Sequence, residues 1–333
     1  MGAWDKRQPG IKLNQLRDFL AVARTGGLRA AARDLDIAQP SLSKSIQTLE
    51  MELGATLFKR ASRGAVLTPV GSALLVRAEA VMQELRRARE EVSQLTSGGG
   101  GGVAFGITAA PAFLFLARVL NDYRVRYPDV SVRVIDGIYP VVLPELKDGR
   151  LDFSVGPEPE RSLGDDFTLE RLFESTRVPV CRRGHPMELE TSLCALTDAH
   201  WLVTAADQEP FEAFGRIFSD RNLPVPTKVT LCETSLGLVE LLMNTDMICW
   251  LPRQWLDAPL LSSWLTDIPI TIDMQGPDIC LVRRRNLPLT PAADHLATLI
   301  RRACHRHKRK AEMPLTGFSE KFPQPPQQFS LVS

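Results

Sequence analysis

Three polar residues, Gln39, Ser43 and Lys44, stand close together in the sequence and are of types that can read DNA bases. A glutamine amide can form two hydrogen bonds with adenine, and a lysine ammonium can reach O6 and N7 of guanine. Such contacts require the three side chains to project from the first turns of a helix that lies in the major groove. The chemistry expected of this segment is hydrogen bonding to base edges.

The surrounding residues predict two short helices joined by a tight turn. Residues 28–35 form an Ala-rich helical pattern, in which Ala31 and Ala32 are small enough for a second helix to pack closely. Pro40 falls in the first turn of that second helix, where proline is tolerated, and Gly54 ends it. The core between the helices would contain Leu35, Ile37, Leu42, Ile46 and Leu49. This pattern is typical of a helix-turn-helix.

A small hairpin over residues 57–68 and a long helix after Pro69 follow the helix pair. Apolar residues of the long helix alternate at spacings of four and three: Leu74, Ala78, Val81, Leu85, Ala88, Val92 and Leu95. A narrow stripe of this kind, flanked by charge, favours a coiled coil that joins two copies of the chain. The alternative is a helix that packs the same stripe against its own domain.

Charge is distributed unevenly along the 333 residues, although the formal net charge is only +1. Residues 1–97 hold 15 Lys and Arg against 10 Asp and Glu, whereas residues 98–300 hold 18 against 27. Six further basic residues lie within residues 301–310. Such asymmetry indicates a nucleic-acid-binding module attached to a different kind of domain.

Five consecutive glycines, residues 98–102, predict a flexible hinge between the two parts. Beyond the hinge, strand-like and helical segments alternate, which predicts parallel sheets covered by helices. About 200 residues of this pattern suit two lobes with a ligand cleft at the carboxyl ends of the strands. The chain after Lys310 is rich in Pro and Gln and is predicted to be disordered.

Signatures of catalysis, metal binding and membrane insertion are missing from the sequence. The segment at Ser235 lacks the first glycine of a nucleophile elbow, and the five histidines show no metal-ligand spacing. We therefore expect no enzymatic activity, metal or cofactor. With no apolar run long enough for a membrane span and no export signal, we expect a cytoplasmic protein. The cysteines are then reduced core residues, with a thiol redox sensor as the alternative: Cys181, Cys194, Cys232, Cys249, Cys280 and Cys304.

An ordered set of motifs resembles the LysR-type transcriptional regulators over about residues 11–304. In the N-terminal part the matching residues are Ala31–Ala32, Leu35, Gln39–Pro40, Leu42–Ser43, Ile46, Leu49–Glu50, Leu53–Gly54, Leu57–Phe58, Arg60, Leu67–Thr68 and Gly71. In the later part they are Tyr127–Pro128, Gly149–Arg150–Leu151–Asp152 and His185–Pro186. Gly27 and Ala38 depart from the family, which often has Ser or Thr there; as a helix cap, alanine loses about 1 kcal/mol.

The resemblance implies a sequence-specific regulator of transcription that binds double-stranded DNA. Base contacts would come from Gln39, Pro40, Ser43 and Lys44, and Arg63 in the hairpin would enter the minor groove. Arg29, Lys59 and Arg60 would contact phosphates. The resemblance also implies a dimer of dimers, and RNA polymerase is a candidate partner.

The later domain resembles the two-lobed fold of type 2 periplasmic binding proteins, with a small effector held between the lobes. Carried over by motif, the effector site would comprise Thr108, Ala109, Tyr139, Thr204, Thr234 and Ser235. Their hydroxyl and backbone N–H groups suit a carboxylate or sulfonate, which favours an organic acid; the threonines could equally be helix caps. A transport solute-binding protein with the same fold is disfavoured by the N-terminal domain.

The expected fold class is α/β with an N-terminal all-α winged helix-turn-helix. The expected divisions are a flexible N-terminus (1–10), the winged helix-turn-helix (11–69), a linker and dimerisation helix (70–97), the hinge (98–102), the effector domain (103–304) and a basic, then Pro-rich tail (305–333). Within the effector domain, lobe I would take residues 103–172 and 268–304, and lobe II residues 173–267. Crossover strands are expected near residues 160–175 and 260–275.

Overall fold

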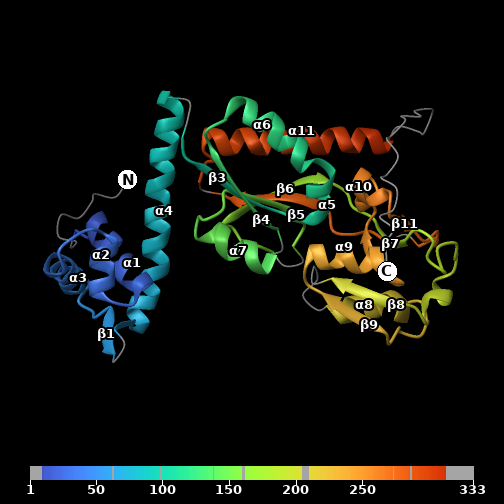
Figure 1. The fold of residues 1–333 in the computed structure, drawn as a ribbon, viewed down its shortest axis with the longest axis horizontal. Helices are drawn as coiled ribbons and strands as arrows, with labels where there is room; N and C mark the ends of the chain where they lie inside the picture. The colour runs from blue at the N-terminus through green and yellow to red at the C-terminus, as the bar shows by residue number, and fades with distance from the viewer. Residues whose placement is uncertain are drawn as a thin grey trace, which may run out of the picture.

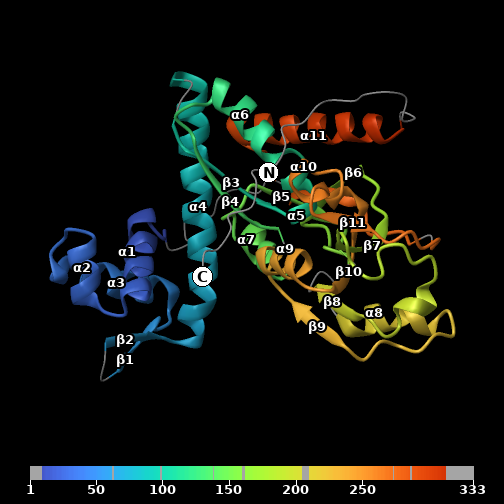
Figure 2. The ribbon, with the colours of Figure 1, turned by 45° about the vertical axis from the view of Figure 1, so that its right-hand side comes forward.

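The computed structural model describes residues 10–61, 64–97, 100–137, 139–159, 162–204, 210–272, 274–285 and 287–312. A small helical domain and a larger α/β part lie on opposite sides of one long helix, α4 (Pro69–Ser97). The same order holds in the turned view (Figures 1 and 2). Helix α4 therefore links two bodies of different architecture.

The N-terminal domain contains three helices and a two-stranded hairpin. Helices α1 (Leu13–Thr25), α2 (Leu28–Asp34) and α3 (Gln39–Leu53) precede the antiparallel strands β1 (Phe58–Ala61) and β2 (Gly64–Leu67). The helix-turn-helix and the hairpin are thus confirmed. The apolar residues of all three helices meet in one core, whose fully buried members include Phe19, Leu42 and Leu49.

Capping of these helices follows the expectation from their sequence. Gly27 before α2 and Ala38 before α3 make no side-chain hydrogen bond to the helix N-terminus. Asp36, in the turn between the two helices, has a φ of 53°, a left-handed conformation that aspartate tolerates better than most residues. At the start of α3, therefore, the side chain at the cap position accepts no hydrogen bond from the backbone N–H groups of the first turn.

The hairpin is held against the start of α4 by a close backbone approach at Gly71. The Thr68 hydroxyl accepts a hydrogen bond from Gly71 N at 3.0 Å and donates to the carbonyl of Thr56 at 2.7 Å. A Cβ atom added to Gly71 would lie 2.2 Å from the carbonyl oxygen of Leu57. Glycine is required at this position because the chain entering the hairpin passes directly over it.

We predict that Gly71→Ala lowers the stability of the N-terminal domain by about 1–3 kcal/mol, the usual cost of overpacking. Chemical denaturation followed by circular dichroism measures the change. Gly215→Ala is the matched control in another helix, because its Cβ would meet Val225 at an ordinary 3.7 Å. There alanine should stabilise by about 0.5–1 kcal/mol. Equal effects of the two substitutions would contradict the explanation.

The first lobe of the α/β part is built on a five-stranded sheet in the order β4-β3-β5-β12-β6. Its strands are β3 (Gly102–Ile107), β4 (Ser131–Asp136), β5 (Phe153–Pro157), β6 (Phe167–Phe173) and β12 (Ile279–Arg284). Helices α6 (Ala117–Arg126) and α11 (Pro291–Glu312) lie over one face (Figure 1), and α7 (Tyr139–Lys147) packs on the other. Successive residues of β3 alternate between these two cores, as strand geometry demands.

The second lobe has its own five-stranded sheet in the order β11-β7-β10-β8-β9. Its strands are β7 (Arg177–Arg182), β8 (His200–Thr204), β9 (Val229–Cys232), β10 (Met247–Pro252) and β11 (Leu265–Asp267). Helix α8 (Pro210–Ser219) covers one face, and α9 (Ser235–Asn244) covers the other, with the short elements η3 (Arg253–Trp255) and α10 (Pro259–Ser262). The turn η2 (Leu193–Leu196) also packs beside α8.

Both sheets are mixed, so the expectation of parallel sheets was wrong for part of each. Strand β12 pairs antiparallel with β5 and β6, and β7 pairs antiparallel with β10 and β11. The chain passes from the first sheet to the second after β6 and returns before β12. A strand that enters from the other lobe need not run parallel to its neighbours, and the local sequence pattern does not encode its direction.

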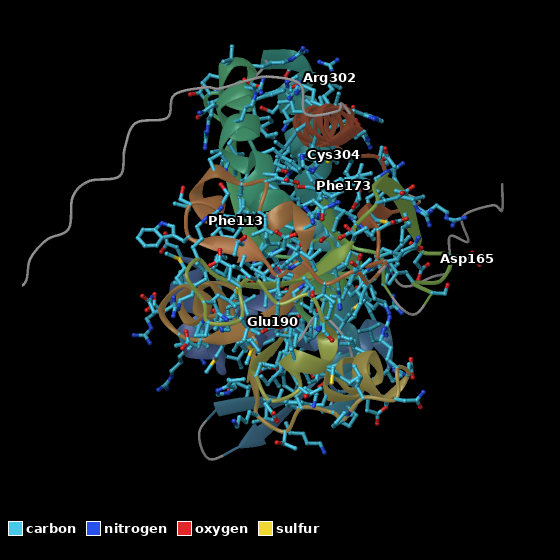
Figure 3. All side chains as sticks on the ribbon, turned by 90° about the vertical axis from the view of Figure 1, so that its right-hand side faces the viewer. Phe113, Asp165, Phe173, Glu190, Arg302 and Cys304 are labelled. Atoms are coloured by element: carbon cyan, nitrogen blue, oxygen red, sulfur yellow. The ribbon has the colours of Figure 1, made fainter. Side chains whose placement is uncertain are left out.

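Helix α11 continues to Glu312, past residue 304, where the effector domain was expected to end. In Figure 3, Cys304 lies on the side of α11 that faces Phe173, whereas Arg302 lies on the outer side. His307 extends this inner face, with its ring 5.7 Å from that of Phe173 and Nε2 3.6 Å from an oxygen of Asp257 in the second lobe. The tail beyond residue 312 lies outside the described residues.

Candidate functional site

The N-terminal end of α3 presents the side chains expected to read DNA. Gln39 is the first residue of the helix, and Gln39, Pro40 and Lys44 are exposed while Ser43 is half-buried. The opposite side of the same helix is anchored in the core by Leu42 and other apolar residues. The helix is therefore fixed from behind and offers polar groups in front, as a recognition helix requires.

The basic residues expected to contact phosphates are placed on neighbouring elements. Arg29 is exposed on α2, and Lys59 is exposed on β1. Arg60 belongs to β1, but its side chain lies outside the described part of the structure, and so does Arg63. Glu50 of α3 accepts hydrogen bonds from the backbone N–H groups of Leu57 and Phe58, at 2.6 and 3.2 Å. This carboxylate fixes the entry into the hairpin that carries Lys59.

Helix α4 is docked on the first lobe through a buried arginine. The side chain of Arg87 is 9% exposed; its Nη2 atom donates to the carbonyl oxygens of Gly149 and Leu151, at 2.7 and 2.8 Å, and lies 3.2 Å from Asp152 Oδ1. Asp152 in turn accepts from the backbone N–H of Ala104 at 2.8 Å. Burial raises the pKa of Asp152, although the charge of Arg87 opposes that shift. The pair thus ties the linker helix to strands β3 and β5.

The Gly-Arg-Leu-Asp motif at residues 149–152 therefore has a structural role: it is the surface on which helix α4 docks. Gly149 adopts a φ of 77°, which favours glycine. Arg150 forms ion pairs with Glu145 and Asp148 beside it, at 2.8 and 2.9 Å, and with Glu79 of α4 at 3.5 Å. The resemblance had identified the motif, and the structure explains why these residue types stand together.

Two further contacts continue the docked face of α4 in both directions. Gln94 accepts a hydrogen bond from Ala292 N at the start of α11, at 3.0 Å. Glu84 lies 3.5 Å from Arg284 of β12. In addition to the predicted glycine hinge at residues 98–102, α4 and the first lobe are therefore joined by polar contacts.

We predict that Arg87→Ala destabilises the first lobe by about 3–5 kcal/mol, because it leaves the buried Asp152 carboxylate unpaired. Arg89→Ala is the control, since Arg89 is an exposed arginine on the same helix and its loss should cost less than about 0.5 kcal/mol. Urea denaturation of both variants measures the difference. A loss of under about 1 kcal/mol for Arg87→Ala would show that the pair contributes little.

The apolar stripe of α4 is used in two ways. Ala78 is 1% exposed in the core of the N-terminal domain, and Leu74 packs against the same core, so this end of the stripe belongs to its own domain. Farther along, Val81, Val92 and Leu95 are 45%, 60% and 71% exposed. The exposed half lies on the side of the helix away from Arg87 and Gln94. The dimer seam predicted from Leu74 onward is therefore available only toward the C-terminal end of α4.

A cavity of about 120 Å³ lies between the two lobes. Residues of the first lobe that line it include Thr108, Ala109, Asp136 and Ile279; those of the second include Arg177, Thr204, Cys232, Glu233, Thr234, Ser235, Trp250 and Trp255. Most stand at strand ends or helix starts, where the two sheets face each other. This position is the one expected for ligands of open α/β sheets.

Direct contacts join the lobes around this cavity. The hydroxyl of Ser235 donates to Asp136 Oδ2 at 3.1 Å. The rings of Phe113 and Trp255 have centroids 5.4 Å apart. Phe113 belongs to the π-helical turn η1 (Ala112–Leu116), which follows the short helix α5 (Ala109–Pro111). Such turns recur at functional sites, and this one carries its aromatic ring toward the other lobe.

Five of the six residues expected at the effector site line the cavity; Tyr139 does not. Tyr139 begins α7 and packs against the core of that helix with Leu163 and Phe167. Burial raises its pKa above the usual range. Four further residues line the cavity that were not predicted from the sequence: Asp136, Arg177, Glu233 and Trp250. Glu233 adjoins Thr234 in the sequence and could have been found, whereas Arg177 and Trp250 reach the cavity only through the pairing of β7 with β10.

All six cysteines are free thiols in the structure. Burial raises the pKa of Cys181, Cys280 and Cys304 to about 12, and that of Cys249 higher still. Reactive cysteines require a thiolate, so these four are poor candidates for redox chemistry. Their environment fits the interpretation that they serve as small core residues.

A helix-turn-helix joined to two lobes that enclose a cavity defines a class of protein, the ligand-responsive DNA-binding regulators. Residues 13–72 match the model of the family described as "Bacterial regulatory helix-turn-helix protein, lysR family". Residues 96–305 match that of the "LysR substrate binding domain". The chain belongs to the LysR family of transcriptional regulators: it binds DNA and carries a substrate-binding domain.

Individual relatives agree with this assignment. The chain is 26% identical to the HTH-type transcriptional regulator TdcA of Escherichia coli K12 over 288 residues, 86% of this chain and 92% of TdcA. It is 34% identical to the regulator BudR of Raoultella terrigena over 192 residues, 57% of this chain and 66% of BudR.

Solved structures share the fold. Full-length CbnR in complex with its target DNA superposes with a TM-score of 0.62 at 19% identity, covering 88% of this chain and 99% of that one. ArgP from Mycobacterium tuberculosis superposes with a TM-score of 0.63 at 17% identity, covering 87% of this chain and 96% of that one.

None of the described helices combines the length and apolar character needed to cross a membrane.

Proposed function

We propose that this regulator, a cytoplasmic protein without enzymatic activity, binds its operator through the exposed start of α3. The observation that supports the proposal is the exposure of Gln39, Pro40 and Lys44 on a helix whose other side is fully anchored. Ser43 completes this surface, and Arg29, Lys59, Arg60 and Arg63 supply phosphate and minor-groove contacts around it. We assign residues 11–69 to this function and residues 70–97 to the linker, as expected from the sequence.

Two substitutions separate base reading from phosphate binding. Gln39→Ala should cost about 1–3 kcal/mol of operator affinity and relax specificity at one position of each half-site. Lys59→Ala should instead weaken binding to all sequences alike and reduce the salt slope by about one unit. Fluorescence anisotropy on operator and scrambled DNA over a range of salt measures both. Identical profiles for the two variants would contradict the assignment.

We propose further that a small effector binds in the cavity between the lobes and changes their relative position. Hydroxyl groups from both lobes, including those of Thr108 and Thr204, line this space. The effector therefore contacts elements of both lobes and favours one lobe arrangement over others, which is the requirement for a ligand-driven shift. A carboxylate-bearing organic acid is the effector class that the hydroxyl groups and helix starts favour.

The exposed half of the α4 stripe supports a homodimer, and two such dimers would form the tetramer expected of this family. RNA polymerase remains a candidate partner once the oligomer occupies its operator. Val81, Val92 and Leu95 expose apolar surface on a helix whose other face is already docked. A second copy of α4 would cover that surface through coiled-coil packing.

We predict that Val92→Glu shifts the protein toward smaller assemblies, because a charge would be placed in an apolar seam. Val92 is exposed within its own chain, so the substitution should leave the monomer fold intact. Val76→Glu is the control: Val76 is 48% exposed on the same helix and lies off the seam. Analytical ultracentrifugation distinguishes the outcomes. If both variants keep the native size, the α4 seam is not the dimer interface.

A further inference from the structure

We infer that a backbone contact between Gly26 and the hairpin positions the hairpin for DNA binding, which makes Gly26 and Gly64 positioning residues. They act through the basic residues of β1, Lys59 and Arg60. The inference rests on the phosphate contacts proposed for those two residues and concerns how they are held beside the recognition helix α3.

The hairpin of β1 and β2 needs support from outside its own ladder. Each strand has four residues, and neither pairs with another strand among the described residues. A hairpin of this size is marginally stable on its own and twists readily. Its direction relative to α3 therefore depends on contacts with the rest of the N-terminal domain.

One end of the hairpin, its base, is anchored in the core. Phe58 and Leu67 pair with each other across the ladder, and both pack against the buried cluster of the three helices. The ring of Phe58 lies 5.3 Å from that of Phe19, and Glu50 accepts a hydrogen bond from Phe58 N at 3.2 Å. These contacts fix where the hairpin begins, but a ribbon held only at its base could still bend or twist at the other end.

The far end of the hairpin is held by a backbone hydrogen bond to the turn between α1 and α2. Ala65 N donates to the carbonyl oxygen of Gly26 at 2.8 Å. Gly26 ends α1 in the left-handed conformation, with a φ of 71°. Arg60 lies directly across the ladder from Ala65, and Lys59 is one pair closer to the base. The contact therefore fixes the part of β1 that carries the basic residues.

Gly64 is required for this approach. Its φ of 130° lies in the region that favours glycine. A Cβ atom added there would lie 2.2 Å from the carbonyl oxygen of Gly26. Because that atom belongs to the backbone and not to a flexible side chain, the hairpin would have to move by about 1 Å to restore an ordinary contact. A Cβ atom on the neighbouring Gly27 would meet nothing within 4 Å.

The contact couples two groups of cations that are expected to meet the DNA backbone. Helix α2, which carries the exposed Arg29, begins two residues after Gly26. Phosphate contacts set the register and orientation of a protein on the duplex. Cations held at fixed separations can meet the phosphates without first being ordered, whereas a loosened hairpin would lose affinity to that ordering. Gly26 and Gly64 thus contribute to DNA affinity without carrying a group that binds DNA.

The salt dependence of DNA binding by the full-length protein tests the inference. The probes are a labelled duplex of random sequence and an operator selected from a random-sequence pool with the wild-type protein. For each lost phosphate contact, the ratio of Kd at 200 mM to Kd at 50 mM KCl should fall about threefold. Gly64→Ala should lower this ratio at least as much as Lys59→Ala. Added to the pair Lys59→Ala and Arg60→Ala, it should cause no further fall.

A second variant and a control separate positioning from stability. Ala65→Pro removes the N–H group that donates to Gly26 without adding an atom at Gly64, and proline is tolerated where an edge strand donates outside its ladder. It should lower the salt ratio as Gly64→Ala does. Gly27→Ala replaces the cap residue of α2 with a poorer one, so it should lower the melting temperature and leave the salt ratio unchanged.

The salt ratio distinguishes the outcomes because a smaller folded fraction weakens binding by the same factor at every salt concentration. If Gly64→Ala and Ala65→Pro lower only the melting temperature or the overall affinity, the contact is merely structural and the inference is overturned. If they lower the ratio while Lys59→Ala with Arg60→Ala does not, the hairpin is positioned as inferred and the proposed phosphate contacts are wrong. An unchanged ratio in every variant would contradict both.

Discussion

The buried pair of Arg87 and Asp152 is the interaction on which the arrangement of the whole chain depends. Desolvating two charges is costly, and burial raises the pKa of Asp152, so the pair is held by geometry as much as by attraction. The two backbone carbonyls that share Nη2 with Asp152 supply that geometry. Because a buried charge cannot exchange partners freely, α4 is fixed against the first lobe at one register. The N-terminal domain packs on the other end of α4, so this contact also sets the position of that domain relative to the first lobe.

The docking of α4 on the first lobe determines which parts of the protein can move relative to one another. The first lobe, α4 and the helix-turn-helix are coupled through buried contacts, whereas the second lobe meets the first mainly around the cavity, at pairs such as Ser235–Asp136 and Phe113–Trp255. A ligand between the lobes therefore acts on the second lobe relative to a unit that includes the DNA-binding domain. The two faces of α4 differ, since one is docked and the other exposes valine and leucine, the surface that we propose is covered by a second copy. In the proposed dimer, a shift of the second lobe would change how the two subunits meet and so act on the DNA-binding domains.

The elements that depend on local sequence patterns were predictable, whereas those that depend on strand pairing were not. The helix-turn-helix was predictable because the apolar spacing of residues such as Leu42 and Ile46 describes its core directly. The resemblance to the LysR-type regulators placed Thr108, Thr204 and Thr234 at the cavity, and each stands at or just after the end of a strand. The docking role of Arg87 could not be predicted, because a buried arginine on the face opposite the apolar stripe leaves no periodic signal. Tyr139 was misplaced because it is the first residue of α7 and packs in the core between that helix and the first sheet, outside the lining of the cavity.

The charged residues of the cavity show why part of its lining could be recognised only in three dimensions. Asp136 and Glu233 lie almost one hundred positions apart and belong to different lobes, so their shared location is a property of the closed cleft. Arg177 and Trp250 come together through antiparallel pairing, which the alternation of strands and helices did not predict. The hydroxyl groups identified from the sequence are neutral and accept or donate to almost any polar ligand. Selectivity must therefore come from the residues that strand pairing adds to the lining, such as Arg177 and Trp250.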